Sequence, residues 1–335
     1  MTLAQTINPE QKPLQTWDYK NFEYPDPVNE VADRFNAVSY EQHMASVQGT
    51  TDVAPSGIGF ALLSERGDST TDAIVHLHPF CNGLTNNMLL RAKFIKGVAD
   101  KIGLTDEKGD NLPLYSLAAP SRTSGLVDIR PDRLKDIRFG DVGILAFRGL
   151  RIAVERNVKR LHLIGNSLGG SLVMSAVNLP LPYDVEFASA TASATPNIAQ
   201  RSKLGLGMAF LRQGSKLEEA IENGGIDAIA IAQSENTPRD FVREFLAQRV
   251  LNTALFRGLC WPTVSLETSA VPLTFAYGTD DPLTRPRDVQ ELLSEIDTFT
   301  GMLHVIEGKG VNHATPDDLR YLATLYGYGM TRGVS

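Results

Sequence analysis

The sequence predicts an α/β protein built around a mostly parallel β-sheet, and three observations support this. Short runs rich in Val, Ile and Leu alternate with helical segments along most of the chain. The runs cover residues 57–65, 73–80, 112–120, 160–167, 184–193, 271–278 and 302–310. They are apolar on both faces, which is typical of strands buried under helical crossovers. A capping residue, a Pro and first-turn acids also occur in the order of a helix start, as in Thr315-Pro316-Asp317-Asp318 before the last helix.

The spacing of these runs predicts one large domain with an insertion. The chain of 335 residues exceeds the usual size of a single small domain. Residues 1–50 show little periodicity and are expected to form an irregular N-terminal arm, whose role is open. The core is expected over 51–193 and 269–335, and the helical segment 194–268 is too long for a simple crossover. We therefore expect this segment to be an inserted helical cap.

Composition excludes several classes of protein. Apolar residues make up 42% and charged residues 21% of the chain, which excludes wholesale disorder. The net charge of −7 disfavours binding to nucleic acid. Neither a secretory signal nor a membrane-spanning run is visible, so we expect a cytoplasmic protein. Cys81 and Cys260 lack the spacing of a metal or redox motif and are expected to be free thiols.

The sharpest motif is Gly165-Asn166-Ser167-Leu168-Gly169-Gly170, between an apolar run and a helical run of small residues. A Ser on a sharp strand-to-helix turn needs flanking residues without Cβ atoms, which explains the glycines on either side of it. Such a turn presents the hydroxyl above the sheet. The sequence therefore predicts that Ser167 is a nucleophile.

A serine nucleophile needs a base and a carboxylate that orients the base. His313 ends the loop Gly308-Lys309-Gly310-Val311-Asn312-His313 after the last predicted strand, and we expect it to be the base. The carboxylate is expected from Asp281 or Asp280, where another strand breaks into a turn. Asp281 is favoured because it precedes Pro282, which restricts its backbone to extended geometry.

These residues together resemble the α/β-hydrolase superfamily. Gly-x-Ser-x-Gly after a strand, Gly278 to Pro282 after a later strand and a loop His near the end follow that family's order Ser, Asp, His. The resemblance covers roughly residues 55–330. It implies an eight-stranded, mostly parallel sheet, a serine triad at its carboxyl edge and a helical cap after the sixth strand.

The resemblance also implies an oxyanion hole of two backbone N–H groups, for which Leu168 and Phe80 are expected. Pro79 stands where the family usually has Gly, and it has no N–H to donate. The His76-x-His78 pair on one strand face is an alternative metal site, but no further His/Asp cluster completes its ligands. The His loop and residues 119–125 also depart from the commoner family patterns, which argues against a close subfamily.

The expected function is hydrolysis of a carboxylic ester through an acyl-enzyme, on a small-molecule acyl or aromatic substrate and without a cofactor. An alternative is hydrolysis of a carbon–carbon bond in ring-cleavage products, because Gly-Asn-Ser-x-Gly-Gly is similar to the elbow of that branch of the superfamily. A thioesterase or acyltransferase would use the same triad. A ligand-binding protein that has lost turnover is the non-enzyme alternative. Substrate identity and oligomeric state are open.

Overall fold

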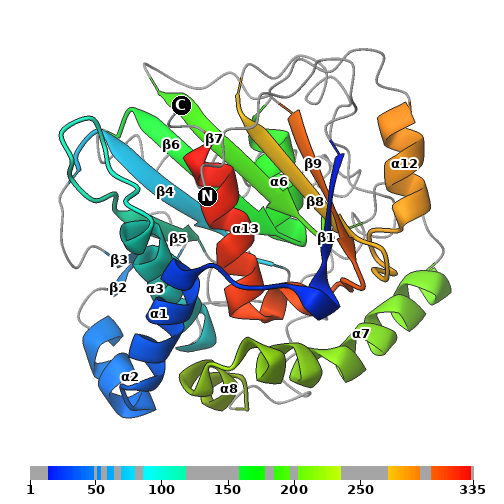
Figure 1. Ribbon diagram of the computed structural model, residues 1–335, viewed down its shortest axis with the longest axis horizontal. Coiled ribbons are helices and arrows are strands. Elements are labelled where there is room, and N and C mark those ends of the chain that lie inside the picture. Colours follow the sequence, from blue (N-terminus) through cyan, green and yellow to red (C-terminus); the bar gives the residue numbers. More distant parts are fainter. Residues whose placement is uncertain are drawn as a thin grey trace.

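The sheet of the protein has nine strands within the residues that the structure describes. The computed structural model describes residues 14–48, 51–53, 59–63, 69–79, 86–117, 158–177, 185–196, 203–234, 271–294 and 303–332. The strand order is β1-β9-β8-β7-β6-β4-β5-β3-β2 (Figure 1). The strands are β1 (Leu14–Asp18), β2 (Thr51–Val53), β3 (Gly59–Leu63), β4 (Asp72–Leu77), β5 (Leu114–Leu117), β6 (Arg160–Asn166), β7 (Glu186–Ser193), β8 (Leu273–Gly278) and β9 (Leu303–Lys309).

Most of the sheet is parallel, as the sequence predicts. From β1 through β9, β8, β7, β6 and β4 to β5, every neighbouring pair is parallel, whereas β3 pairs antiparallel with both β5 and β2. Strands β3 to β9 fall on the seven predicted apolar runs, and β4 begins one residue before its run, at Asp72. Strands β2 to β9 make up the expected eight, and β1 adds a ninth at the edge next to β9. The carboxyl ends of the parallel strands therefore meet at one edge, where sites in such sheets form.

Helices cover both faces of the sheet. Against one face, α1, α3 and α13 bury a large apolar cluster that includes Phe35, Phe94, Ile74 and Tyr326. In Figure 1, α3, α1 and α13 lie in front of the sheet and α6 lies behind it. The helical elements are η1 (Tyr19–Asn21), α1 (Asp26–Asn36), α2 (Tyr40–Gln48), α3 (Asn86–Lys101), α6 (Leu168–Ala176), α7 (Lys203–Gly224), α8 (Asp227–Ser234), α12 (Pro286–Ser294), η3 (Thr315–Asp317) and α13 (Leu319–Thr331). None of these helices is long and apolar enough to cross a membrane.

The N-terminal arm is more regular than the sequence predicts. Where an irregular segment was expected, residues 14–48 form β1, η1, α1 and α2. Helix α1 buries Val28, Val31 and Phe35 on one face, a spacing of three and four residues. Pro25 and Pro27 flank its first residue, and a Pro is tolerated in the first turn because its missing N–H has no partner there. The expectation of an irregular arm is therefore wrong for these residues.

The last helix begins later than predicted. Thr315, expected as the capping residue, instead starts the short η3, and its Oγ1 accepts a hydrogen bond from Asn312 N at 2.9 Å. Helix α13 begins at Leu319, and the Asp318 side chain caps it by accepting from the N–H groups of Arg320 and Tyr321. The pattern Thr-Pro-Asp-Asp holds two possible caps, and the single turn of 3₁₀ helix makes the second one the cap of α13.

The insertion between β7 and β8 is helical in its described part. It contains α7 and α8, which lie below the sheet in Figure 1. The Gln213 side chain of α7 accepts a hydrogen bond from Ala314 N at 3.0 Å, which joins α7 to the segment between β9 and α13. Residues 197–202 and 235–268 of the expected cap lie outside the described residues.

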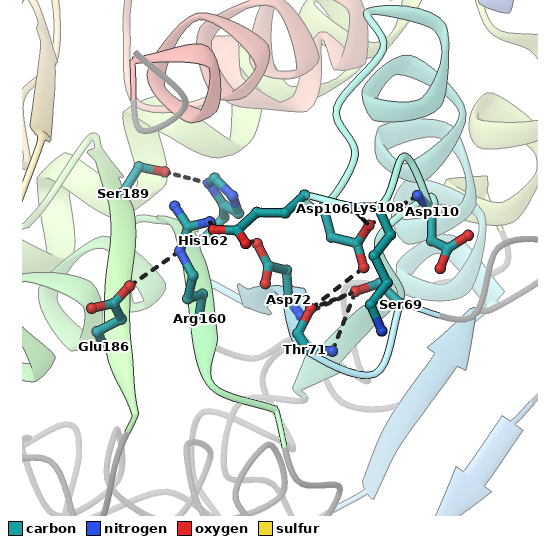
Figure 2. A network of polar contacts seen from close by, with 11 residues as sticks. Ser69, Thr71, Asp72, Asp106, Lys108, Asp110, Arg160, His162, Glu186 and Ser189 are labelled. Carbon is teal, nitrogen blue, oxygen red and sulfur yellow. Dashed lines mark hydrogen bonds and ion pairs between the residues drawn. The ribbon is translucent and has the colours of Figure 1, made fainter.

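A polar network ties together the other edge of the sheet, where the strands begin (Figure 2). Arg160 starts β6 and pairs with Asp72 of β4 at 3.2 Å and with Glu186 of β7 at 3.1 Å. Burial raises the pKa of Asp72. The carboxylate of Asp106 accepts the N–H groups of Lys108 and Asp110, which shapes the turn before β5. This network fixes strand ends on the side away from the candidate site.

Candidate active site

Ser167 lies on a strained turn between β6 and α6. Its φ of 54° and ψ of −124° fall outside the regions that L-residues favour, which costs about 1–3 kcal/mol. The turn closes tightly. A Cβ at Gly169 would lie 1.9 Å from Leu77 O, and one at Gly165 would lie 2.4 Å from Gly169 O. Ser167 N donates to Ser193 O of β7 at 2.9 Å, which fixes the turn to the sheet. The turn therefore has the geometry expected of a nucleophile elbow.

His313 lies beside this serine although 146 residues separate them in the sequence. Its Nε2 is 2.9 Å from Ser167 Oγ. The loop that carries it runs from β9 to η3, and Ala314 N donates both to Asn312 Oδ1 at 2.8 Å and to Gln213 Oε1 at 3.0 Å. The His313 side chain is 10% exposed, so it is mostly buried but not sealed from solvent.

Asp281 holds the other nitrogen of this imidazole. Its Oδ2 is 2.9 Å from His313 Nδ1, and its side chain is fully buried. Its Oδ1 accepts the N–H groups of Leu283 at 2.7 Å and Thr284 at 2.9 Å. Asp280, the alternative, is exposed and accepts from the hydroxyl of the adjacent Thr279. The structure therefore brings Asp281, and not Asp280, to His313.

The geometry sets the imidazole tautomer. An ionised carboxylate accepts hydrogen bonds and donates none, so His313 Nδ1 carries the proton that faces Asp281. Nε2 then offers its lone pair to the hydroxyl of Ser167. This arrangement can remove a proton from an alcohol oxygen that approaches an acyl carbon.

Of the expected oxyanion pair, the structure describes one member. Leu168 is the first residue of α6, so its backbone N–H has no partner within the helix. Phe80 lies outside the described residues. The strand that leads toward it ends close to the elbow, since a Cβ at Gly169 would contact the carbonyl groups of both Leu77 and His78.

The His76–His78 pair is buried beneath this edge and bonds to protein. Both side chains are about 1% exposed, and their rings lie 4.2 Å apart. His78 Nε2 hydrogen-bonds to Ser116 Oγ, which lies 3.4 Å from His76 Nδ1. Burial lowers the pKa of His76 to about 3 and that of His78 well below its ordinary value, and the nearby Arg91 guanidinium acts in the same direction. Among the described residues, no three His, Cys, Asp or Glu side chains gather as a metal site requires.

Two other sets of residues near the site had no clear signal in the sequence. Gln213 reaches the His loop from the insertion. Asp318, which follows the loop, is fully buried and accepts the hydroxyl groups of Tyr19 and Tyr24 from the N-terminal arm. No local pattern pairs residues so far apart in the chain. Cys81 and Cys260, expected as free thiols, lie outside the described residues.

Comparison with solved structures finds esterases and thioesterases of similar fold. A carboxylesterase structure from the thaumarchaeon Nitrososphaera gargenis is 14% identical with a TM-score of 0.50, over 85% of this chain and 98% of its own. The chain has the α/β-hydrolase fold. A structure assigned as an aryl esterase from Burkholderia cenocepacia is 16% identical with a TM-score of 0.49, over 84% and 99% of the two chains. A thioesterase domain from the curacin biosynthetic pathway is 14% identical with a TM-score of 0.48, over 82% and 97%.

No protein-family model matches the sequence, and no curated protein is detectably similar to it. At 14% identity the carboxylesterase structure shows the α/β-hydrolase fold alone. A function must therefore be argued from the site of this chain.

Proposed function

We propose that the protein is a serine hydrolase that cleaves carboxylic esters through an acyl-enzyme. One observation carries the proposal: hydrogen bonds of 2.9 Å and 2.9 Å join Ser167 Oγ to His313 Nε2 and His313 Nδ1 to Asp281 Oδ2. The serine lies on a strained turn, and the imidazole that it contacts is itself held by a buried carboxylate. A surface serine that contacts a histidine by chance would lack both features.

In the proposed reaction, Ser167 Oγ attacks the ester carbon while His313 Nε2 takes the hydroxyl proton. Asp281 holds the imidazole and stabilises the imidazolium that forms. The N–H groups of Leu168 and Phe80 stabilise the negative oxygen of the tetrahedral intermediate, and His313 returns the proton to the leaving alcohol. Water then attacks the acyl-enzyme with the same base, and the carboxylic acid leaves. The steps use side chains and backbone of this chain, so we propose that no cofactor takes part.

We further propose that residues 194–268 are a cap that shapes the substrate site. The hydrogen bond from Ala314 N to Gln213 Oε1 supports this, because it places α7 against the loop of His313. Ligand pockets in proteins are mostly lined by apolar side chains with a few polar anchors. A pocket of this kind under the cap would favour a small-molecule substrate with an acyl or aromatic group.

A fluorophosphonate probe tests the activated serine, because it forms a covalent bond with a serine hydroxyl that a neighbouring base has made nucleophilic. We expect wild-type protein to be labelled and the Ser167→Ala variant not to be. Ser171→Ala is the matched control, since Ser171 is a buried serine one turn further along α6 and should leave labelling intact. Labelling that persists in Ser167→Ala, or that never occurs in wild type, would refute the triad.

A substrate panel then separates the possible reactions. The proposal expects hydrolysis of short p-nitrophenyl esters that is lost in Ser167→Ala. Faster turnover of acyl thioesters would indicate a thioesterase, and turnover of a vinylogous diketo acid alone would indicate the carbon–carbon bond hydrolase. Transfer of the acyl group to an added alcohol in preference to water would indicate an acyltransferase. Labelling without turnover of any of these would favour the ligand-binding alternative.

A further inference from the structure

The N-terminal arm holds the strand that leads into the His313 loop. Strand β1 pairs in parallel with β9 along its whole length, from Leu14 opposite Val305 to Asp18 opposite Lys309. Strand β9 ends at Lys309, four residues before His313, and its other neighbour is β8, which leads to Asp281. The strand that leads to the imidazole is thus held on one side by β8 and on the other by the arm.

The arm also holds the chain just after the loop, through one carboxylate. Asp318, five residues after His313, has an exposed fraction of 0%. Its Oδ2 accepts the hydroxyl of Tyr19 at 3.0 Å and that of Tyr24 at 2.5 Å, while its Oδ1 accepts the first N–H groups of α13. Burial, with Asp318 alongside, raises the pKa of both tyrosines, so both remain hydrogen-bond donors.

An aromatic cluster under the loop connects these two contacts. Trp17 of β1 packs against Tyr321 of α13 with ring centroids 6.1 Å apart, and Tyr19 packs against the same ring at 5.4 Å. Val311, two residues before His313, is buried in the same cluster. A shift of the arm would therefore displace both ends of the His313 loop, which has fewer than ten residues between β9 and Asp318.

We propose that Tyr19 and Tyr24 are positioning residues for His313, and that they act through Asp318. The two hydroxyls anchor the start of α13, and with β1 on β9 they fix both ends of the loop that carries the imidazole. This inference rests on the proposed function of His313 as the base. The arm then pre-organises the site without touching substrate, and misplacement of a catalytic group by about 1 Å costs up to about 100-fold in rate.

The double variant Tyr19→Phe/Tyr24→Phe tests this, because it removes both hydroxyls and keeps both rings. We expect kcat for ester hydrolysis to fall by about 10- to 100-fold with KM within about twofold, at a temperature well below both unfolding midpoints. Tyr328→Phe is the matched control. Tyr328 borders the same aromatic cluster, but its hydroxyl bonds to His304 at 2.9 Å, near the other end of α13. Its kcat should stay within about twofold of wild type.

A second measurement follows the hydrogen bond of the His313 imidazole directly and does not depend on turnover. The His313 Nδ1 proton bonded to a carboxylate should give a far-downfield proton NMR signal, assigned by its loss in His313→Ala. We expect the double variant to shift or broaden this signal and Tyr328→Phe to preserve it. If kcat and the signal are both unchanged in the double variant, the inference is wrong. If the double variant does not fold, Tyr24→Phe alone, which removes the shorter bond, is judged by the same two readouts.

The two proposals fail in different ways. If wild-type Ser167 is not labelled by fluorophosphonate, the proposed function fails, and the NMR signal still decides whether the arm positions His313. If labelling and turnover are normal in wild type, and kcat and the NMR signal are both unchanged in Tyr19→Phe/Tyr24→Phe, the arm is structural only and the proposed function stands.

Discussion

Replacing Asp281 by Asn should strongly lower kcat of the proposed enzyme. The loss of charge is one cause, and the other is that two backbone hydrogen bonds fix the orientation of the new amide group. Oδ1 of this side chain accepts the N–H groups of Leu283 at 2.7 Å and Thr284 at 2.9 Å. An amide can accept these bonds only with its oxygen, so the NH₂ group of Asn must face His313. The imidazole must then accept at Nδ1 and carry its proton on Nε2. That proton points at Ser167 Oγ, and the base can no longer take the hydroxyl proton.

The size of this effect follows from the tautomer. The corresponding change in a Ser-His-Asp triad lowers kcat by about 10⁴-fold, which is about 5.4 kcal/mol of transition-state free energy. The fold should tolerate the change. Asn has the same shape, keeps both backbone bonds and can donate to Nδ1, so we expect the free energy of unfolding to change by only about 1 kcal/mol.

Initial rates on p-nitrophenyl acetate, together with urea unfolding of the same samples, measure both quantities. Asp280→Asn is the control, since Asp280 is exposed and its side chain bonds to Thr279 alone among the side-chain contacts described. It should retain nearly full activity. If Asp281→Asn keeps a tenth or more of the wild-type kcat, or if Asp280→Asn is the variant that loses it, the assignment of the carboxylate is wrong.

Three further predictions test the base, the elbow and the buried histidines. His313→Ala should lower kcat by about 10⁴-fold while the unfolding midpoint, followed by circular dichroism, stays within a few degrees; a protein that fails to fold would make His313 structural. Gly169→Ala should lower the free energy of unfolding by about 1–3 kcal/mol and remove most of the activity, because its Cβ would lie 1.9 Å from Leu77 O. Gly207→Ala in α7 is the control: its Cβ meets nothing within 4 Å, so its effect on stability should be neutral or favourable. Equal effects of the two substitutions would contradict the close approach at Gly169. The pKa of His76 is lowered to about 3, so between that value and its ordinary pKa of about 6.5 the unfolded chain binds more protons, and stability should fall as pH drops below about 6.5. His76→Leu should make the fall shallower by up to about 1.4 kcal/mol per pH unit in urea titrations at several pH values, and an unchanged slope would mean that His76 is protonated in the folded protein.

Features that depend on local backbone constraints could be predicted from the sequence. The strands from β3 to β9 fall on runs that are apolar on both faces. Ser167 was found because a sharp strand-to-helix turn requires glycine at fixed offsets, and the structure shows why, with Gly165 and Gly169 packed against backbone. His313 and Asp281 follow strands at a shared edge, so their proximity could be expected once a parallel sheet was predicted.

The structure of the arm was not predictable in the same way. Strand β1 is short and mostly exposed, and its pairing partner lies almost 300 residues later in the sequence. The apolar stripe of α1 follows a Pro-rich start and is obvious only when the surface that it covers is known. The expected cap of the last helix, Thr315, was displaced to Asp318 by a 3₁₀ turn whose bonds depend on the folded His loop.

By itself, the sequence determined the layered α/β architecture and the chemical types available at the carboxyl edge of the sheet, because strand burial and turn geometry act over a few residues. The tertiary structure alone decided which of two adjacent aspartates meets the imidazole, and that two tyrosines of the arm meet Asp318 across 299 and 294 residues. Such contacts depend on how separate elements dock, and a hydrogen bond between distant side chains leaves no periodic trace in the chain. Local rules therefore located the candidate site, and packing decided how it is held.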